Sequence, residues 1–166
     1  MGVSGWKYFV PYQSNITKAL NELREQVFQS GKFYKRQPFW QDLDDDEYAD
    51  EEDEDLRAQL SDWLRTMKAL KEPTTIDELL VWNEEDGTHS ILDYTEISSI
   101  PEIGKIAPLS PQQLLNLFDT EKPTHNMVKQ KVDTIMQLRE TWQATYIIIY
   151  QADLPNQIFF TGYSGD

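Results

Sequence analysis

The chain contains no cysteine, only two histidines and no apolar run long enough to cross a bilayer. The absence of cysteine excludes disulfides and thiolate chemistry, and it leaves carboxylates and two imidazoles to build any metal site. The N-terminal MGVSGWKYFV has neither the charged start nor the long apolar centre of a secretory signal. We therefore expect a soluble protein located in the cytoplasm.

Basic residues are also scarce, because 15 Lys and Arg stand against 29 Asp and Glu and give a net charge of −14. Nucleic acids bind to concentrated basic surfaces, and none is visible here, so we expect no nucleic-acid partner and no membrane partner. The chain lacks the G-x-S-x-G, Walker, dinucleotide-binding and H-E-x-x-H motifs. We expect no cofactor, and the composition favours a protein that is not an enzyme.

The residues that are present indicate a globular fold. Hydrophobic residues make up 39% of the 166 positions and aromatic residues 12%, which is enough for a core and argues against disorder of the whole chain. This length is typical of one domain. We expect a single domain over residues 1–166, with an exposed acidic loop at about residues 41–55.

Helical patterns occur in the first half of the chain. Following a strand at Trp6–Tyr12, apolar residues at helical spacing lie between Asn15 or Ser14 as N-cap and Gly31 at the end. A second stripe recurs at spacings of four, three, four and three before Pro73, and it predicts a helix with a buried face formed by Leu56, Leu60, Trp63, Met67 and Leu70. Thr75 and Glu78 form a capping box that begins a short third helix.

The second half of the chain ends in a predicted hairpin. Residues 88–98 suggest at most a short strand, and the prolines and glycine of 99–108 predict a loop. Helices are expected from Pro111 and over residues 123–144, with Trp142 in the core. The run Tyr146–Tyr150 is typical of a central strand that is covered on both faces.

Together these elements predict an α+β fold. A small, mainly antiparallel sheet, made of the N-terminal strand and the C-terminal hairpin, would pack with about five helices.

The acidic segment, residues 42–55, holds eleven carboxylates and no base, so the rest of the chain has a net charge of only −3. A cluster of Lys32, Lys35 and Arg36 precedes it and could pair with some of these acids. An EF-hand loop needs Gly at position 6 and Glu at position 12, but a loop starting at Asp42 or Asp44 fits neither requirement. The segment is therefore either a solvated connector or an acidic surface for a partner.

We expect that the partner, if there is one, is a basic protein that an immunity protein or inhibitor would bind. The segment also contains Leu43 and Tyr48, which purely solvating tails seldom include. The predicted partner-binding carboxylates are those of Asp44, Asp45, Asp46, Glu47, Glu51 and Glu52.

An alternative hypothesis is a small enzyme or ligand-binding domain. His89 and Asp93 are close in the sequence, and a histidine beside a carboxylate can act as a general base. Tyr163, near the glycines of the C-terminal FFTGYSGD, could line the same pocket. This hypothesis requires the three side chains to converge.

Four segments, VPY, LREQVFQSGKFY, GTHSILD and GYSGD, resemble segments of small bacterial proteins whose function is not known. The resemblance covers the two ends of the chain better than the acidic middle. It implies no activity, cofactor or catalytic residue.

Overall fold

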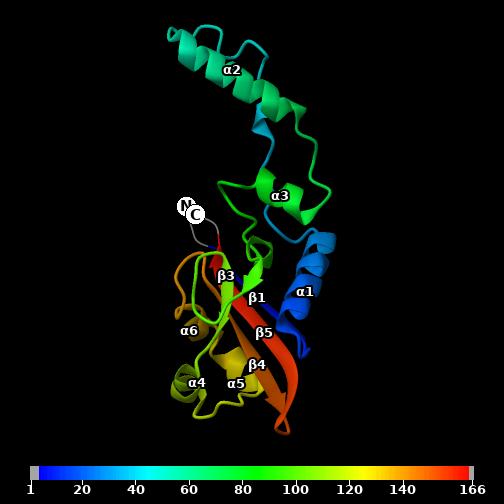
Figure 1. Ribbon diagram of the computed structural model, residues 1–166, viewed down its shortest axis with the longest axis vertical. Helices are drawn as coiled ribbons and strands as arrows, with labels where there is room; N and C mark the ends of the chain where they lie inside the picture. The colour runs from blue at the N-terminus through cyan, green and yellow to red at the C-terminus, as the bar shows by residue number, and fades with distance from the viewer. Residues whose placement is uncertain (1–3, 165–166) are drawn as a thin grey trace.

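The computed structural model describes residues 4–164, which form a five-stranded sheet with helices on both faces and a projecting arm (Figure 1). The strands are β1 (Ser4–Pro11), β2 (Glu96–Ile97), β3 (Lys105–Pro108), β4 (Ala144–Gln151) and β5 (Leu154–Ser164). The α-helices are α1 (Ile16–Ser30), α2 (Glu54–Ala69), α3 (Ile76–Trp82), α4 (Pro111–Phe118), α5 (His125–Gln130) and α6 (Val132–Met136). The short 3-10 helices are η1 (Phe39–Gln41) and η2 (Ile91–Asp93). The predicted α+β class is confirmed.

The sheet has the strand order β1-β5-β4-β3-β2, so β4 is the central strand, as its apolar run predicts. The terminal strands β4 and β5 form an antiparallel hairpin, and β1 pairs antiparallel with β5. Strands β2 and β3 add a parallel part, which makes the sheet mixed. At Gly162, a Cβ atom would lie 2.8 Å from the Trp6 ring, so this close strand packing requires glycine.

Both faces of the sheet are buried, because neighbouring residues of a strand point to opposite sides. Ile158 and Phe160 of β5 pack with the apolar face of α1, which includes Leu20 and Leu23. Phe159, between them, packs on the other side against the helical layer α4, α5 and α6. Within residues 4–164, no helix has both the length and the apolar character needed to cross a membrane.

The predicted helix ends agree with the structure where the signals are local. The Asn15 side chain accepts a hydrogen bond from the Lys18 backbone N–H at 2.9 Å, and Gly31 closes α1 with φ +65°. Capping boxes begin α3 at Thr75 and α4 at Ser110. Local capping chemistry therefore sets these ends.

The predicted loop over residues 99–108 is partly wrong, because β3 lies within it. Ile106 and Ala107 are buried and pair in parallel with β4, and Pro108 stands at the strand end. The 88–98 region contributes η2 and only the two residues of β2. A parallel partner is far away in sequence, so local composition could not indicate this strand.

The predicted long helix over residues 123–144 is also wrong. It is broken at Lys131 into α5 and α6, and helical structure ends at Met136. Beyond that point, the backbone N–H groups of Leu138 and Arg139 make turn bonds, the Arg139 side chain donates to the Pro108 carbonyl, and the Trp142 N–H donates to the Tyr163 carbonyl. These bonds turn the chain toward β4, which begins at Ala144.

Trp142 is a turn residue and not a member of a helical core face. Its φ is +65°, it is half-buried, and its ring lies against Gly87. Gly87 has φ +69° and leaves no room for a Cβ beside that ring.

Candidate functional site

The arm, residues 39–70, projects away from the sheet and contains η1, the acidic segment and α2 (Figure 1). The chain enters it after Arg36 and returns to the body through the residues that precede α3. Asp53 is the N-cap of α2, because its carboxylate accepts hydrogen bonds from the backbone N–H groups of Asp55 and Leu56, both at 3.0 Å. The last acids of the segment therefore lie at the positive end of the helix dipole, where they are favourable.

A small hydrophobic cluster, separate from the two clusters on the sheet, holds the arm together. Trp40, Leu64 and Trp82 are buried in it, and their neighbours are half-buried. The Trp82 indole N–H donates to the Arg36 carbonyl at 2.9 Å, which fixes α3 to the chain that enters the arm. Since Trp82 belongs to α3, this cluster also joins the arm to the body.

The acidic segment is exposed but has a defined course. Consecutive turns are closed by backbone hydrogen bonds from Glu47 to Asp44, from Ala49 to Asp46 and from Glu51 to Tyr48. Within the segment, Leu43 and Tyr48 are half-buried and pack against the hydrophobic cluster of the arm. These two apolar residues attach the segment to α2 while its carboxylates face water.

Few of these carboxylates are neutralised within the chain. Among the described residues, only Asp45 and Glu54 of the segment form ion pairs, with Lys68 at 2.7 Å and with Arg57 at 3.9 Å. The Lys68 ammonium donates a hydrogen bond to Asp45 and lowers the pKa of its carboxyl below the ordinary value. Nine of the eleven acids have no cationic partner within residues 4–164, so their field extends into solvent.

The basic cluster that precedes the segment does not neutralise it, contrary to expectation. Lys35 pairs with Glu72 at 3.1 Å, and Arg36 pairs with Glu85 and Asp86 at 2.9 and 3.6 Å. Across residues 4–164, no ion pair joins Lys32 to the segment either. The Arg36 side chain lies over the rings of Phe39 and Trp40, which directs it toward the base of the arm.

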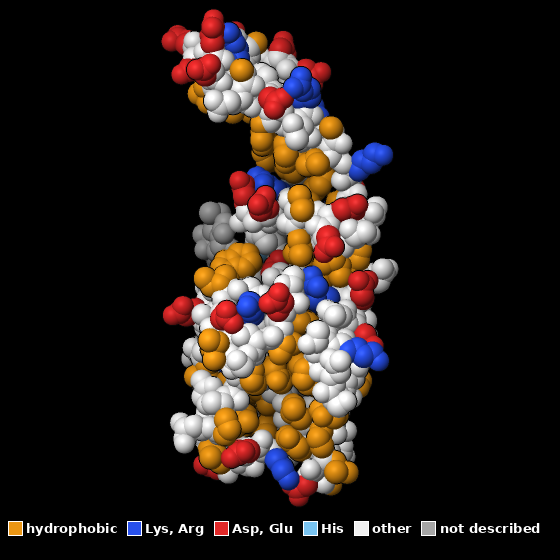
Figure 2. Space-filling model, viewed as in Figure 1, with side chains coloured by type: hydrophobic (Ala, Val, Ile, Leu, Met, Phe, Trp, Pro, Cys, Tyr) orange, Lys and Arg blue, Asp and Glu red, His pale blue; other side chains and the backbone are white. Residues whose placement is uncertain are grey.

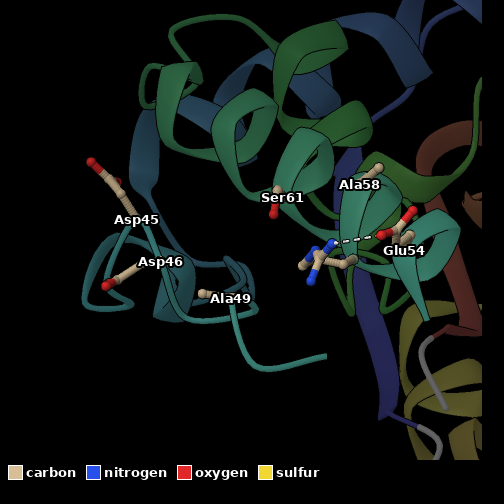
Figure 3. A pocket seen from close by; sticks show the side chains of 7 residues that line it. Asp45, Asp46, Ala49, Glu54, Ala58 and Ser61 are labelled. Carbon is tan, nitrogen blue, oxygen red and sulfur yellow. Dashed lines mark ion pairs between the residues drawn. The ribbon is translucent and has the colours of Figure 1, made fainter. Parts of the chain in front are cut away.

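An open cleft of about 670 Å³ separates the acidic segment from α2. Figure 3 shows Asp45 and Asp46 on one side of it and Glu54, which pairs with Arg57, on the other. Their carboxylates point in different directions and do not converge. In the part of the chain that the structure describes, no three His, Asp or Glu side chains are arranged to hold a metal ion. Asp45 pairs with Lys68 and Glu54 with Arg57, so Asp46 is the carboxylate of the cleft for which no ion pair is found within residues 4–164.

The structure does not bring His89, Asp93 and Tyr163 together. His89 has φ +53°, its Nδ1 lies 3.1 Å from the Ser4 hydroxyl, and its ring stacks on Tyr34. Asp93 accepts hydrogen bonds from the backbone N–H groups of Thr88 and Ser90 at 2.7 and 3.4 Å, so it shapes the turn that precedes η2.

Tyr163 packs with its side chain on the other face of the sheet, against the cluster of α4, α5 and α6, where it lines with Arg139 a cavity of about 450 Å³ that includes neither His89 nor Asp93. Its carbonyl accepts a 2.6 Å hydrogen bond from the Tyr94 hydroxyl, whose pKa is raised mainly by burial. Within residues 4–164, no hydrogen bond joins the three candidate side chains to one another.

The buried face of α2 was predicted correctly only in part, because Met67 and Leu70 pack against the cluster of the arm but the other predicted residues do not. Leu64, which lies beside the predicted stripe, is the buried residue of this helix, and it packs against Trp40 and Trp82. Two residues predicted for the core are exposed: Leu56 is 42% and Trp63 is 36% accessible. The stripe was visible in the sequence, but the side on which η1 and α3 would pack was not.

Comparisons of the chain with protein-family models, with curated proteins and with solved structures found no match.

Proposed function

We propose that this protein is a non-enzymatic interaction protein whose arm binds a basic protein partner, in the manner of an immunity protein or an inhibitor. The observation that carries the proposal is the set of nine carboxylates in residues 42–55 that have no cationic partner among the described residues. Like charges at this density repel one another and oppose folding of the segment. A basic partner would relieve that repulsion.

Two further features support a binding role over that of a solvated connector. A connector needs no fixed conformation, whereas this segment is turned by backbone hydrogen bonds and attached through Leu43 and Tyr48. The segment also lies at the outer part of a projection, where acidic side chains gather on the surface (Figure 2). A partner could reach it there without contacting the sheet.

The experiment compares two variants of equal charge. In the arm variant, five carboxylates of the segment are replaced by their amides: Asp44→Asn, Asp45→Asn, Asp46→Asn, Glu51→Gln and Glu52→Gln. In the body variant, the same charge is removed at five exposed acids for which no ion pair is found among residues 4–164: Glu25→Gln, Asp119→Asn, Glu121→Gln, Asp133→Asn and Glu140→Gln.

The three proteins are immobilised and exposed to a lysate of the native cells, and the retained proteins are quantified. We expect a basic protein that wild type and the body variant retain and that the arm variant loses by about tenfold or more, as for other complexes with several charge pairs. Equal retention of that protein by the arm and body variants would refute the proposal, because the acids of the arm would then contribute no more than acids elsewhere on the surface.

A further inference from the structure

The apolar stripe of α2 is covered only in part by the rest of the arm. Leu56 and Trp63 are exposed and Leu60 is half-buried, whereas Met67 and Leu70, at the other end of the stripe, are half-buried and pack against the hydrophobic cluster of the arm. The side of α2 that Trp40 covers is the side of Leu64, about a quarter turn away. Phe39, itself 49% exposed, lies beside Trp63 with ring centroids 6.3 Å apart and enlarges the open face.

The spacing of this stripe is that of a helix-pairing seam. Intervals of four, three, four and three residues place side chains at the a and d positions of a heptad repeat, which bury themselves against another helix. The stripe spans about 21 Å at the rise of an α-helix, or roughly four turns. A partner helix of similar length would cover it.

The seam continues into a groove at the base of the arm. Leu70, the last residue of the stripe, lines a mainly apolar groove of about 470 Å³ together with Val81 and Trp82 of α3. Figure 2 shows hydrophobic side chains exposed where the arm joins the body. The apolar surface therefore extends beyond a single helix face, as in sites where an amphipathic helix docks into a groove.

The negative charge of the arm determines which kind of helix can cover the stripe of α2. Residues 42–70 carry twelve acidic and three basic side chains. A second copy of the chain, seated with its own α2 on this stripe, would bring two such arms together and be repelled. A basic helix would be attracted, since its flanking Lys and Arg would lie near the acidic segment, in which nine carboxylates have no cationic partner within residues 4–164.

We infer that the open stripe of α2 is the seat for an amphipathic helix of the partner, whose apolar face packs on Leu56 and Trp63 while its Lys and Arg side chains reach the acidic segment. This inference rests on the proposed function and specifies the partner's chemistry. On this account, contacts with the apolar stripe slow the dissociation of the partner, and attraction by the acids speeds its association.

The test uses two synthetic peptides of identical composition. One is a peptide of about 21 residues, or three heptads, with Leu at the a and d positions and Lys at the flanking positions, and the other contains the same residues in an order without an apolar face. Dissociation constants are measured by calorimetry with the wild-type chain, the arm variant and a stripe variant, Leu56→Gln with Trp63→Gln. Glutamine keeps helix propensity.

A matched control carries Ile103→Gln and Leu154→Gln, two residues of the body that are 78% and 70% exposed. Leu56→Gln alone, at a position in the first turn and outside the buried cluster of the arm, provides a milder variant. Its helical circular dichroism should match that of wild type.

We expect wild type and the control to bind the amphipathic peptide about tenfold more tightly than the scrambled one, and the stripe variant to lose that preference. Leu56→Gln should lose part of it. If the scrambled peptide binds equally well, or if the control loses as much affinity as the stripe variant, the inference is wrong. Self-association of wild type in sedimentation experiments that the stripe variant abolishes would also overturn it, because a second copy would then be the occupant.

The proposed function fails in a distinguishable way. If the arm variant binds both peptides as well as wild type does, the acidic segment attracts no basic partner, whatever the stripe does. If the arm variant loses both peptides and the stripe variant loses neither, the charge-based function stands and the helix seat does not.

Discussion

At the scale of single residues, side chains of similar chemistry have quite different roles in this protein. Asp93 and Asp45 have the same carboxylate. Asp93 accepts hydrogen bonds from two backbone N–H groups inside a turn, whereas Asp45 faces water and pairs with Lys68. Side-chain type alone could not separate these roles. Capping residues were predictable, because their hydrogen bonds reach only two or three positions along the chain.

Glu78 provides a test at this scale. The backbone N–H of Thr74 donates a 2.7 Å hydrogen bond to its carboxylate, the Thr74 hydroxyl donates a second, and together they lower the pKa of Glu78 below its ordinary value of 4.5. A carboxyl whose pKa is lower in the folded state stabilises the fold at every pH above its unfolded-state pKa. That stabilisation is lost as the pH falls through the folded-state pKa.

We predict that Glu78→Gln, which keeps an acceptor but removes the charge, is less stable than wild type at pH 7. The difference should be complete above the ordinary pKa of 4.5 and should shrink as the pH falls through the lowered folded-state pKa. Urea denaturation at pH 3 to 7 measures it. Glu84→Gln, at an exposed acid of the same body, is the control. A difference that stays constant over this range would show that the charge of Glu78 contributes nothing.

At the scale of elements, periodicity predicted which segments are helical but not what each helix buries. The stripe of α2 predicted the right helix but missed Leu64 as its buried residue, and the apolar pattern of residues 123–144 concealed the break at Lys131. In both cases the outcome depends on residues that are distant in the sequence. Trp40 and Trp82 decide what α2 buries, and hydrogen bonds to strands β3 and β5 hold the chain that follows α6. Local patterns do not contain this information.

The arm should unfold without the sheet, because its hydrophobic cluster is separate from those on the two faces of the sheet. We predict that Leu64→Ala destabilises the arm by about 2–4 kcal/mol, the usual cost of such a core truncation. Hydrogen exchange followed by mass spectrometry should show faster exchange in α2 and unchanged protection in β4.

The matched control for this variant is Leu60→Ala, a half-buried residue of the same helix that lies on the open stripe. It should accelerate exchange in α2 much less. Equal loss of protection in α2 and β4 after Leu64→Ala would mean that arm and sheet form one cooperative unit.

At the scale of the whole molecule, charge and apolar surface are distributed unequally. The acidic segment carries eleven of the 29 acids, and the same arm exposes an apolar stripe that the described residues leave partly open. The sequence was sufficient to locate the charge. It could not show that the segment is turned and attached by Leu43 and Tyr48, or that the neighbouring basic residues pair elsewhere.

The central claim is that the acids of the arm attract a basic partner. The most direct test is the association rate constant of the captured partner, measured by stopped flow between about 20 and 300 mM salt, where screening changes strongly. Wild type and the body variant should associate rapidly at low salt and slow steeply as salt rises, while the arm variant should associate about tenfold or more slowly at low salt and with a shallow dependence. If the arm variant associates as fast as wild type at low salt, the claim is wrong.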